Sequence, residues 1–153
     1  MNLDLSAAPE IALLAVPAQA PQTPQFPGHL PGNRTLGGLA GELRHIASRP
    51  EQWWGTVRYH SGSSEKIDLG VSGITAWVGV LVPGDPGLYC SCDLMMLVAG
   101  DALEESVADG GSVTTELRAG RVRVHGQGLA HQIRAASAGF AITLHVRGDQ
   151  PIG

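Results

Sequence analysis

Two cysteines separated by a single residue are the side chains of this sequence best suited to chemistry. Cys90 and Cys92 flank Ser91 and are the only two cysteines of the chain. In an extended strand, residues two apart point to the same face, so both thiols would meet on one side. Paired thiolates favour Zn²⁺ or a copper ion. The spacing therefore predicts either a metal site or, because free cysteines commonly pack as small apolar side chains, a piece of the core.

The elements that would position these cysteines are strands joined by tight turns. Trp77–Gly100 is typical of a buried strand, a Pro/Gly turn and a second strand that opens with Cys-Ser-Cys. From Val57 onward, turn-forming residues recur roughly every eight to twelve positions, which indicates many short strands. The chain contains 21 glycines, and only 16% of its residues are charged. These features predict a mainly β fold, a sandwich or a barrel, rather than a helical bundle.

Two of the predicted strands alternate regularly, so that their faces can be assigned. Over Arg121–His125 the valines face one way and the basic residues face the other. Over Phe140–Arg147 the side chains of Thr143, His145 and Arg147 share the face opposite the larger apolar residues. Successive side chains of a strand point to opposite faces. A polar face on such a strand predicts either partial contact with solvent or a polar cavity.

The segment before the strands predicts one or two short helices. Thr35 is a predicted N-cap, and apolar residues recur at helical spacing from Leu36 to Ile46. Pro50 suits the first turn of a second helix over Glu51–Trp54. We expect these helices to pack on the strands that follow.

Residues 1–33 differ from the rest of the chain in composition, because they hold six of its ten prolines. Proline-rich segments favour extended conformations, so we expect an extended arm over 1–33 and a single domain over 34–153. The arm contains an apolar piece, Ile11–Val16, that could lie across the domain or a neighbouring subunit. The arm therefore predicts either a homodimer or a partly disordered tail.

Charge and hydropathy exclude several classes of partner and location. The net charge is −4 and the sequence contains no basic run, so neither a nucleic acid nor an anionic membrane is an expected partner. No stretch approaches the roughly 18 apolar residues that a membrane span requires. Ala18–Ala20 resembles a signal-peptide cleavage site, but no Lys or Arg precedes it. We therefore expect a cytoplasmic protein.

Several motifs, in order and approximate spacing, resemble the cysteine-dioxygenase-like thiol dioxygenases of actinobacteria, a cupin family. These motifs are Asn33-Arg34-Thr35-Leu36, Arg49-Pro50-Glu51-Gln52-Trp53, Gly100-Asp101-Ala102-Leu103-Glu104-Glu105, Gly128-Leu129-Ala130-His131 and Ala141-Ile142-Thr143-Leu144-His145. The resemblance implies a cupin-type jelly-roll β-barrel preceded by helices. For active members it also implies a non-haem Fe(II) ion bound by three histidines, which adds dioxygen to the sulfur of a thiol such as cysteine.

The sequence departs from this family at the metal motif, where its members carry His-x-His. Gap-free counting places the two positions at Pro86 and Leu88, whereas a shifted register places them at Cys90 and Cys92. The third histidine of the family corresponds to His131. Because the histidine pair is lost in either register, we expect a diverged protein that is not a standard cysteine dioxygenase.

Two further family positions are also altered. Gap-free counting places the arginine that grips the substrate carboxylate at His60, with Arg58 two residues earlier on the same strand face. The Ser-His-Tyr series of the last strand becomes Thr143, His145 and Arg147, so the tyrosine is lost.

Our first functional hypothesis is a barrel without a cofactor that binds a small molecule in its cavity. Histidines in such a pocket could perform acid–base catalysis of the cyclase, isomerase or hydrolase type. The candidate catalytic residues are His131, His145 and His60. The candidate substrate-binding residues are Arg58, Tyr89, Thr143, Arg147 and His125.

The alternatives differ in the role that they give to Cys90 and Cys92. In a metal-dependent enzyme, Cys90, Cys92 and His131 would be ligands, with His145 or water completing the set. Zinc or copper suits two thiolates and an imidazole far better than iron does, and an iron ion would correspond to retained thiol dioxygenase activity. The remaining alternative is a pseudoenzyme that serves as a non-catalytic interaction module.

Overall fold

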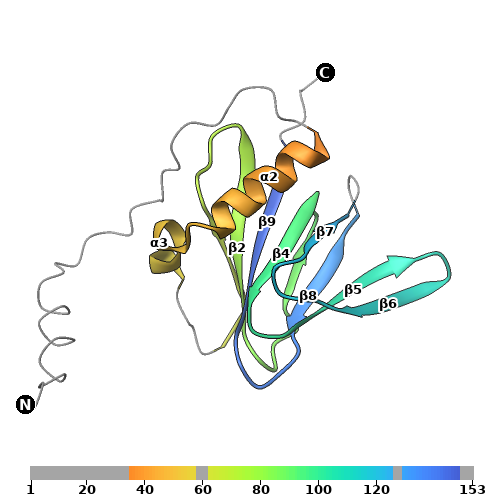
Figure 1. Cartoon of the computed structure of the whole chain (residues 1–153). Helices are drawn as coiled ribbons and strands as arrows, with labels where there is room; N and C mark the ends of the chain where they lie inside the picture. Colours follow the sequence, from red (N-terminus) through yellow and green to blue (C-terminus); the bar gives the residue numbers. More distant parts are fainter. Residues whose placement is uncertain (1–34, 58–61, 126–128, 149–153) are drawn as a thin grey trace, which may run out of the picture.

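The computed structural model describes residues 35–57, 62–125 and 129–148, and it is mainly β (Figure 1). Two helices come first, α2 (Leu36–Ala47) and α3 (Pro50–Trp53), followed by the 3₁₀ turn η1 (Trp54–Thr56). The strands of the described residues are β1 (Glu65–Asp68), β2 (Ile74–Leu81), β3 (Leu88–Cys90), β4 (Leu94–Ala99), β5 (Ala102–Ala108), β6 (Gly111–Glu116), β7 (Val122–Val124), β8 (His131–Ala135) and β9 (Ala141–Gly148). The predicted arm over 1–33 lies outside the described residues.

The strands form two antiparallel sheets that face each other. The strand order is β1-β2-β9-β4-β7 in the five-stranded sheet and β3-β8-β5-β6 in the four-stranded sheet. From β3 onward the chain passes repeatedly from one sheet to the other, as it does in a jelly roll. The predicted mainly β, jelly-roll architecture is confirmed, although the described strands do not close into one continuous barrel.

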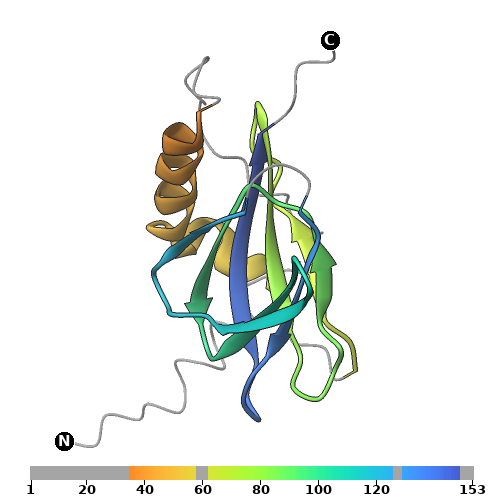
Figure 2. The ribbon, with the colours of Figure 1, turned by 90° about the vertical axis from the view of Figure 1, so that its right-hand side faces the viewer.

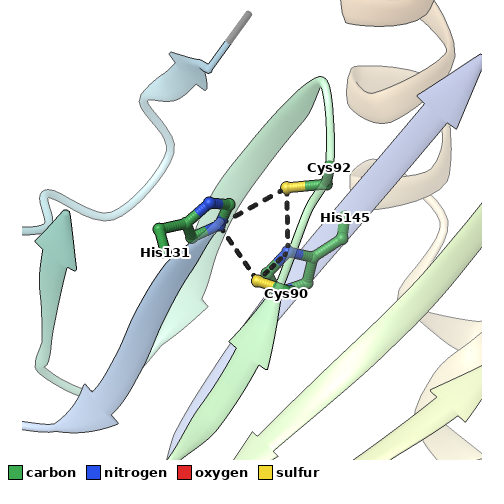
Figure 3. Close-up of side chains that lie close together, drawn as sticks. All are labelled: Cys90, Cys92, His131 and His145. Atoms are coloured by element: carbon green, nitrogen blue, oxygen red, sulfur yellow. Dashed lines mark hydrogen bonds between the residues drawn. The ribbon is translucent and has the colours of Figure 1, made fainter. Parts of the chain in front are cut away.

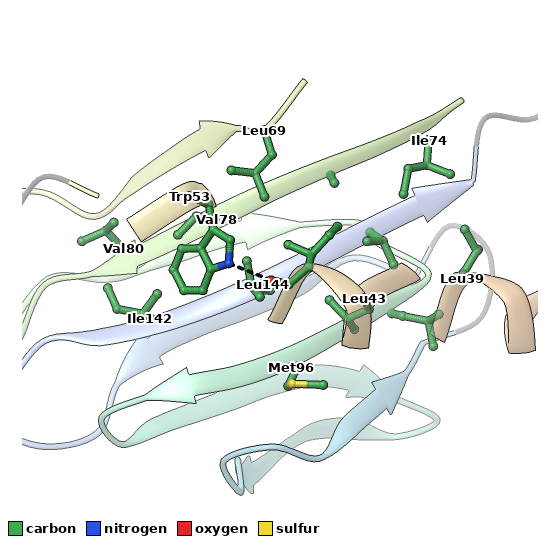
Figure 4. Packing of buried hydrophobic residues seen from close by; sticks show 14 residues of the cluster. Leu39, Leu43, Trp53, Leu69, Ile74, Val78, Val80, Met96, Ile142 and Leu144 are labelled. Carbon is green, nitrogen blue, oxygen red and sulfur yellow. Dashed lines mark hydrogen bonds between the residues drawn. The ribbon is translucent and has the colours of Figure 1, made fainter. Parts of the chain in front are cut away.

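Two apolar cores lie on the two faces of the five-stranded sheet. The helices cover its outer face (Figure 2), where Leu43 and Trp53 pack against a layer that includes Leu144 (Figure 4). The second core lies between the sheets and includes Trp77 and Ile133. Because β9 alternates, its odd and even residues supply the two different cores. This sheet is therefore buried on both faces, and polar side chains on its inner face are shielded from water.

The two predicted helices are confirmed with small shifts of their ends. Thr35 is the N-cap of α2, and its Oγ1 accepts a hydrogen bond of 3.1 Å from the Gly38 N–H. Helix α3 begins at Pro50 rather than Glu51. The Trp53 indole N–H donates to the carbonyl oxygen of Ile46 at 2.8 Å. This bond links the end of α2 to α3, which stabilises the helical layer on the sheet.

The Cys-Ser-Cys segment connects the two sheets. Strand β3 ends at Cys90, Cys92 lies in the connection, and β4 begins at Leu94. Because β3 belongs to the four-stranded sheet and β4 to the five-stranded sheet, the chain must leave one ladder here before it can enter the other. The prediction of a strand that opens with Cys-Ser-Cys is therefore wrong. Both cysteines nevertheless lie against the core between the sheets.

None of the helices in the described part of the chain is long and apolar enough to cross a membrane.

Candidate metal centre

Two thiols and two imidazoles converge in the space between the sheets (Figure 3). Cys90 is the last residue of β3, and Cys92 lies in the following connection. His131 is the first residue of β8, and His145 lies within β9. Cys92, His131 and His145 are at most 3% exposed, whereas Cys90 is only half-buried. Both sheets therefore contribute to the cluster, which joins residues far apart in the sequence.

The register of the strands explains why these side chains meet. Cys90 pairs directly with His131 across the β3–β8 ladder. His145 pairs with Trp77 on one side and with Met95 on the other, in the middle of the five-stranded sheet. The His145 ring is also stacked on the Trp77 indole, with centroids 5.1 Å apart and planes 1° apart. The strand pairing thus fixes the backbone positions, and the stack fixes the orientation of one imidazole.

The separations between sulfur and nitrogen atoms match those around a tetrahedral zinc ion. Cys90 Sγ lies 3.0 Å from His131 Nε2 and 3.9 Å from His145 Nδ1. Cys92 Sγ lies 3.6 Å and 3.4 Å from the same two nitrogens. Zn–S bonds of about 2.3 Å and Zn–N bonds of about 2.0–2.1 Å give tetrahedral S···N edges of about 3.5 Å. The cluster is therefore able to hold a metal ion.

Each imidazole has a hydrogen-bond acceptor at the nitrogen that faces away from the thiols. His131 Nδ1 lies 3.3 Å from the carbonyl oxygen of Leu129. His145 Nε2 lies 2.8 Å from Thr143 Oγ1, which in turn lies 3.5 Å from the carbonyl oxygen of Gly79. A proton on the outer nitrogen leaves the inner nitrogen free to bind a cation, as is usual for histidine ligands of metals.

The hydrogen bonds within the cluster shift the pKa values of its members. The hydrogen bond from Cys92 lowers the pKa of the Cys90 thiol to about 3, with help from both histidines and against the effect of burial. The same hydrogen bond, together with burial, raises the pKa of Cys92. Burial lowers the pKa of His131, but the Cys90 sulfur outweighs it and the net shift is upward. Burial lowers the pKa of His145. A thiolate therefore already exists in the cluster at neutral pH, which favours a cation there.

A chain of hydrogen-bonded side chains, formed by Arg123, Glu104 and His125, adjoins the cluster on the side of Cys92. Glu104 of β5 is only 1% exposed, and its Oε2 accepts hydrogen bonds from Arg123 Nε at 3.0 Å and Nη2 at 2.8 Å. His125 Nε2 bonds to the other carboxylate oxygen. Burial raises the pKa of Glu104, but His125 and Arg123 outweigh it and hold the value at about 2. This carboxylate is therefore a permanent negative charge inside the protein.

Glu104 is a site residue that the sequence-based predictions miss. The signal was present in the alternation of β5, which places Glu104 on the same face as Ala102, and Ala102 is fully buried. A carboxylate on a buried face requires partners, and these come from the basic face of β7 that the sequence does indicate.

The structure brings some of the predicted site residues together and separates others. His131, His145, Thr143, Cys90 and Cys92 lie within the cluster, and His125 lies beside it. The Tyr89 side chain is 77% exposed, and Arg147 is also exposed, so neither reaches the cluster. Arg58 and His60 lie outside the described residues. Of the two pairs that the register leaves open, Cys90 and Cys92 lie beside His131, whereas Leu88 pairs with Ile133.

Comparison with known proteins supports the fold and not a family. No family model matches the chain, and no curated protein matches its sequence. A cupin superfamily protein from Desulfitobacterium hafniense matches with a TM-score of 0.51 at 11% identity, over 63% of this chain and 86% of its own. A cupin domain from Bordetella pertussis gives a TM-score of 0.48 at 14% identity, over 61% of this chain and all (100%) of its own.

The Fe(II) form of the enzyme HppE gives a TM-score of 0.47 at 15% identity, over 60% of this chain and 52% of its own, so the match spans about half of that enzyme. The match to the Desulfitobacterium hafniense protein and the arrangement of the two sheets support the cupin-type fold that the resemblance implies. These identities show the fold alone, and the narrower resemblance to cysteine-dioxygenase-like proteins finds no support among them.

Proposed function

We propose that this protein binds one zinc ion through Cys90, Cys92, His131 and His145, and that the ion holds the two sheets together. The observation that carries the proposal is the set of four thiol–imidazole separations between 3.0 and 3.9 Å. These four ligand atoms come from both sheets and from the connection between them. A metal ion at their centre would cross-link β3 and β8 of the four-stranded sheet to β9 of the five-stranded sheet.

The chemistry of the donor set supports zinc over iron. Tetrahedral coordination by two sulfurs and two nitrogens is characteristic of zinc. Two thiolates also neutralise the charge of a divalent ion, which lowers the cost of burying it. A mononuclear Fe(II) centre for oxygen chemistry uses histidine and carboxylate ligands instead. The resemblance implies three histidine ligands for thiol dioxygenase activity, so the two thiolates of this cluster give that activity little support. The neighbouring residues Glu104, His125 and His131 form a second group that could hold a metal ion.

Four protein ligands also support a structural role for the ion. Structural zinc sites are closed by four protein side chains, whereas catalytic sites keep one position for water or substrate. The inner nitrogens of His131 and His145 both face thiols. The outer nitrogens of these two residues face protein acceptors, so acid–base catalysis without a metal would have to disrupt this arrangement.

Elemental analysis of the full-length protein, purified from zinc-containing medium without a chelator, tests the proposal. We expect about one zinc ion per chain in the parent protein. Cys92→Ser and His131→Gln should lose most of it, whereas Ser91→Ala, a matched control between the two cysteines, should retain it. A parent protein that takes up no zinc from excess ion, or Cys92→Ser protein with a full zinc content, would overturn the proposal.

A second candidate function, metal-assisted chemistry, rests on the exposure of Cys90. Cys90 is half-buried, unlike the other three ligands, so it is the thiolate that a substrate could displace. The cobalt-substituted protein distinguishes the two functions, because azide changes the visible spectrum when a coordination position is open. A closed site predicts an unchanged spectrum, and a change on adding azide would favour the catalytic candidate.

A further inference from the structure

The chain of hydrogen-bonded side chains formed by Arg123, Glu104 and His125 lies beside the four proposed ligands without belonging to them. Glu104 projects from the four-stranded sheet, whereas Arg123 belongs to β7 in the five-stranded sheet and His125 directly follows it. The chain therefore crosses the gap between the sheets. The contact between Arg123 and Glu104 is explained by an ion pair that links the two sheets. This ion pair does not explain why the His125 ring faces Cys92.

His125 ends the chain at two of the proposed ligands. Its Nδ1 lies 3.8 Å from Cys92 Sγ, within hydrogen-bond reach of a sulfur atom. Its ring is stacked on the ring of His131, with centroids 3.9 Å apart and planes inclined by 13°. The carboxylate of Glu104 fixes the other nitrogen, since a carboxylate accepts a hydrogen bond from Nε2. The orientation of His125 toward the sulfur is thus set by Glu104.

Glu104 is itself held in place by Arg123. The guanidinium binds Oε2 through two hydrogen bonds, and this leaves Oε1 for His125. Arg123 is the exposed end of the chain, with 43% of its side chain accessible, whereas Glu104 and His125 are buried. Three hydrogen-bonded residues therefore lead from the surface to the sulfur of Cys92.

We propose that His125 is a positioning residue that lies between two anionic acceptors with an N–H on each ring nitrogen: Nε2–H donates to the Glu104 carboxylate, and Nδ1–H donates to the Cys92 thiolate. The second bond limits how strongly this sulfur donates electrons to the bound metal. This inference rests on the proposed metal centre and assigns a role to residues outside its ligands. A hydrogen bond to a metal-bound thiolate withdraws charge from the sulfur. Partners of this kind commonly change metal affinity by about 10–100-fold.

The sulfur-to-cobalt charge-transfer band of the full-length Co²⁺-substituted protein provides the test. His125→Phe retains a ring that can stack on His131 but removes the nitrogen. Glu104→Gln removes the charge that orients His125. Arg123→Met removes the exposed end of the chain. Two matched controls are Glu105→Gln, which alters the next residue of β5 on the opposite face, and Arg121→Met, which alters an exposed arginine just before β7.

We expect the band to move to lower energy in all three test variants, most in His125→Phe, and the two controls to match the parent. Co²⁺ affinity should change by about 10–100-fold in His125→Phe and Glu104→Gln. A band that stays in place in the test variants would show that the chain only joins the sheets, and this outcome overturns the inference. If His125→Phe does not fold, Arg123→Met decides the question, because 43% of the Arg123 side chain is accessible and its replacement disturbs the core less. A parent protein with no thiolate band overturns the proposed function itself, which separates the two failures.

Discussion

At the scale of single residues, the cluster is defined by the contacts that the two nitrogens of each imidazole make. The inner nitrogens of His131 and His145 face the sulfurs, and the outer nitrogens face a carbonyl oxygen and a hydroxyl. A histidine placed only for packing would not need both partners. Thr143 is therefore as much a part of the site as the residues that would touch the metal, because it fixes the tautomer of His145.

The variant Thr143→Val removes this acceptor while keeping almost the same shape. We expect zinc affinity to fall by about 10–100-fold, since the outer nitrogen of His145 would be left without a partner in a buried position. A competition titration with a chromophoric chelator measures the change. Thr114→Val, on the exposed strand β6, is the matched control. Equal affinities in both variants would contradict the role given to Thr143.

Because the Glu104 carboxylate is buried and paired, we expect the protein to lose stability in acid. Its pKa in the folded protein is about 2, below the ordinary value of 4.5. Because the folded-state pKa is depressed, the contribution to stability is full above the unfolded pKa and is lost as the pH falls from about 4.5 toward 2. Urea unfolding of the metal-free protein at pH 6 and at pH 3 should show a marked loss of stability in the parent. The loss should be smaller in Glu104→Gln, and equal losses would argue against the ion pair.

At the scale of elements, alternation in the sequence predicted which residues share a face but not what covers that face. On β9 the sequence correctly grouped Thr143 and His145, yet both faces proved to be buried because helices cover one side and a second sheet covers the other. The sequence predicted a strand that opens at Cys90, but Cys90 ends β3 and a crossover to the other sheet follows it. Local propensity does not record when a chain changes sheets. Glu104 was missed for a related reason, since its partners lie on a strand of the other sheet.

Strand β2 contains a glycine whose lack of a side chain makes room for the site. A Cβ atom on Gly79 would lie 2.5 Å from Thr143 Oγ1 and 3.3 Å from His145 Nε2. Gly79→Ala should therefore displace the Thr143–His145 hydrogen bond, destabilise the protein by about 1–3 kcal/mol and weaken zinc binding. Chemical denaturation and a metal titration measure the two effects.

The matched change in helix α2 should act in the opposite direction. A Cβ atom on Gly41 meets nothing within 4 Å, so Gly41→Ala should stabilise the protein by up to about 1 kcal/mol through helix propensity alone and leave zinc binding unchanged. An unaltered zinc affinity in Gly79→Ala would contradict the close packing described around His145.

At the scale of the whole molecule, the proposed metal centre would join the two separate sheets. The core between the sheets already holds them by apolar contacts, and the proposed ion adds a link among β3, β8, β9 and the crossover. The sequence could predict the fold class because turn spacing and alternation are local signals. It could not choose between a thiolate site and buried cysteines, because that choice depends on how strands from two sheets are brought together.

Removing the metal should lower the thermal stability of the molecule. At free zinc 100 times above the dissociation constant, binding to the folded state stabilises it by about 2.7 kcal/mol. This corresponds to a rise in Tm of roughly 5–10 °C for a chain of this size. Differential scanning fluorimetry with zinc and with excess chelator measures the shift in the parent and in Cys92→Ser. A parent protein whose Tm does not depend on zinc would contradict a structural role for the ion.

The most direct test of the metal centre is X-ray absorption spectroscopy of the zinc-loaded protein. The structure predicts two sulfur scatterers at about 2.3 Å and two nitrogen scatterers at about 2.0–2.1 Å, with the sulfur shell reduced in Cys92→Ser. A zinc environment made only of nitrogen and oxygen atoms would place the ion elsewhere. It would leave Cys90 and Cys92 as side chains of the core.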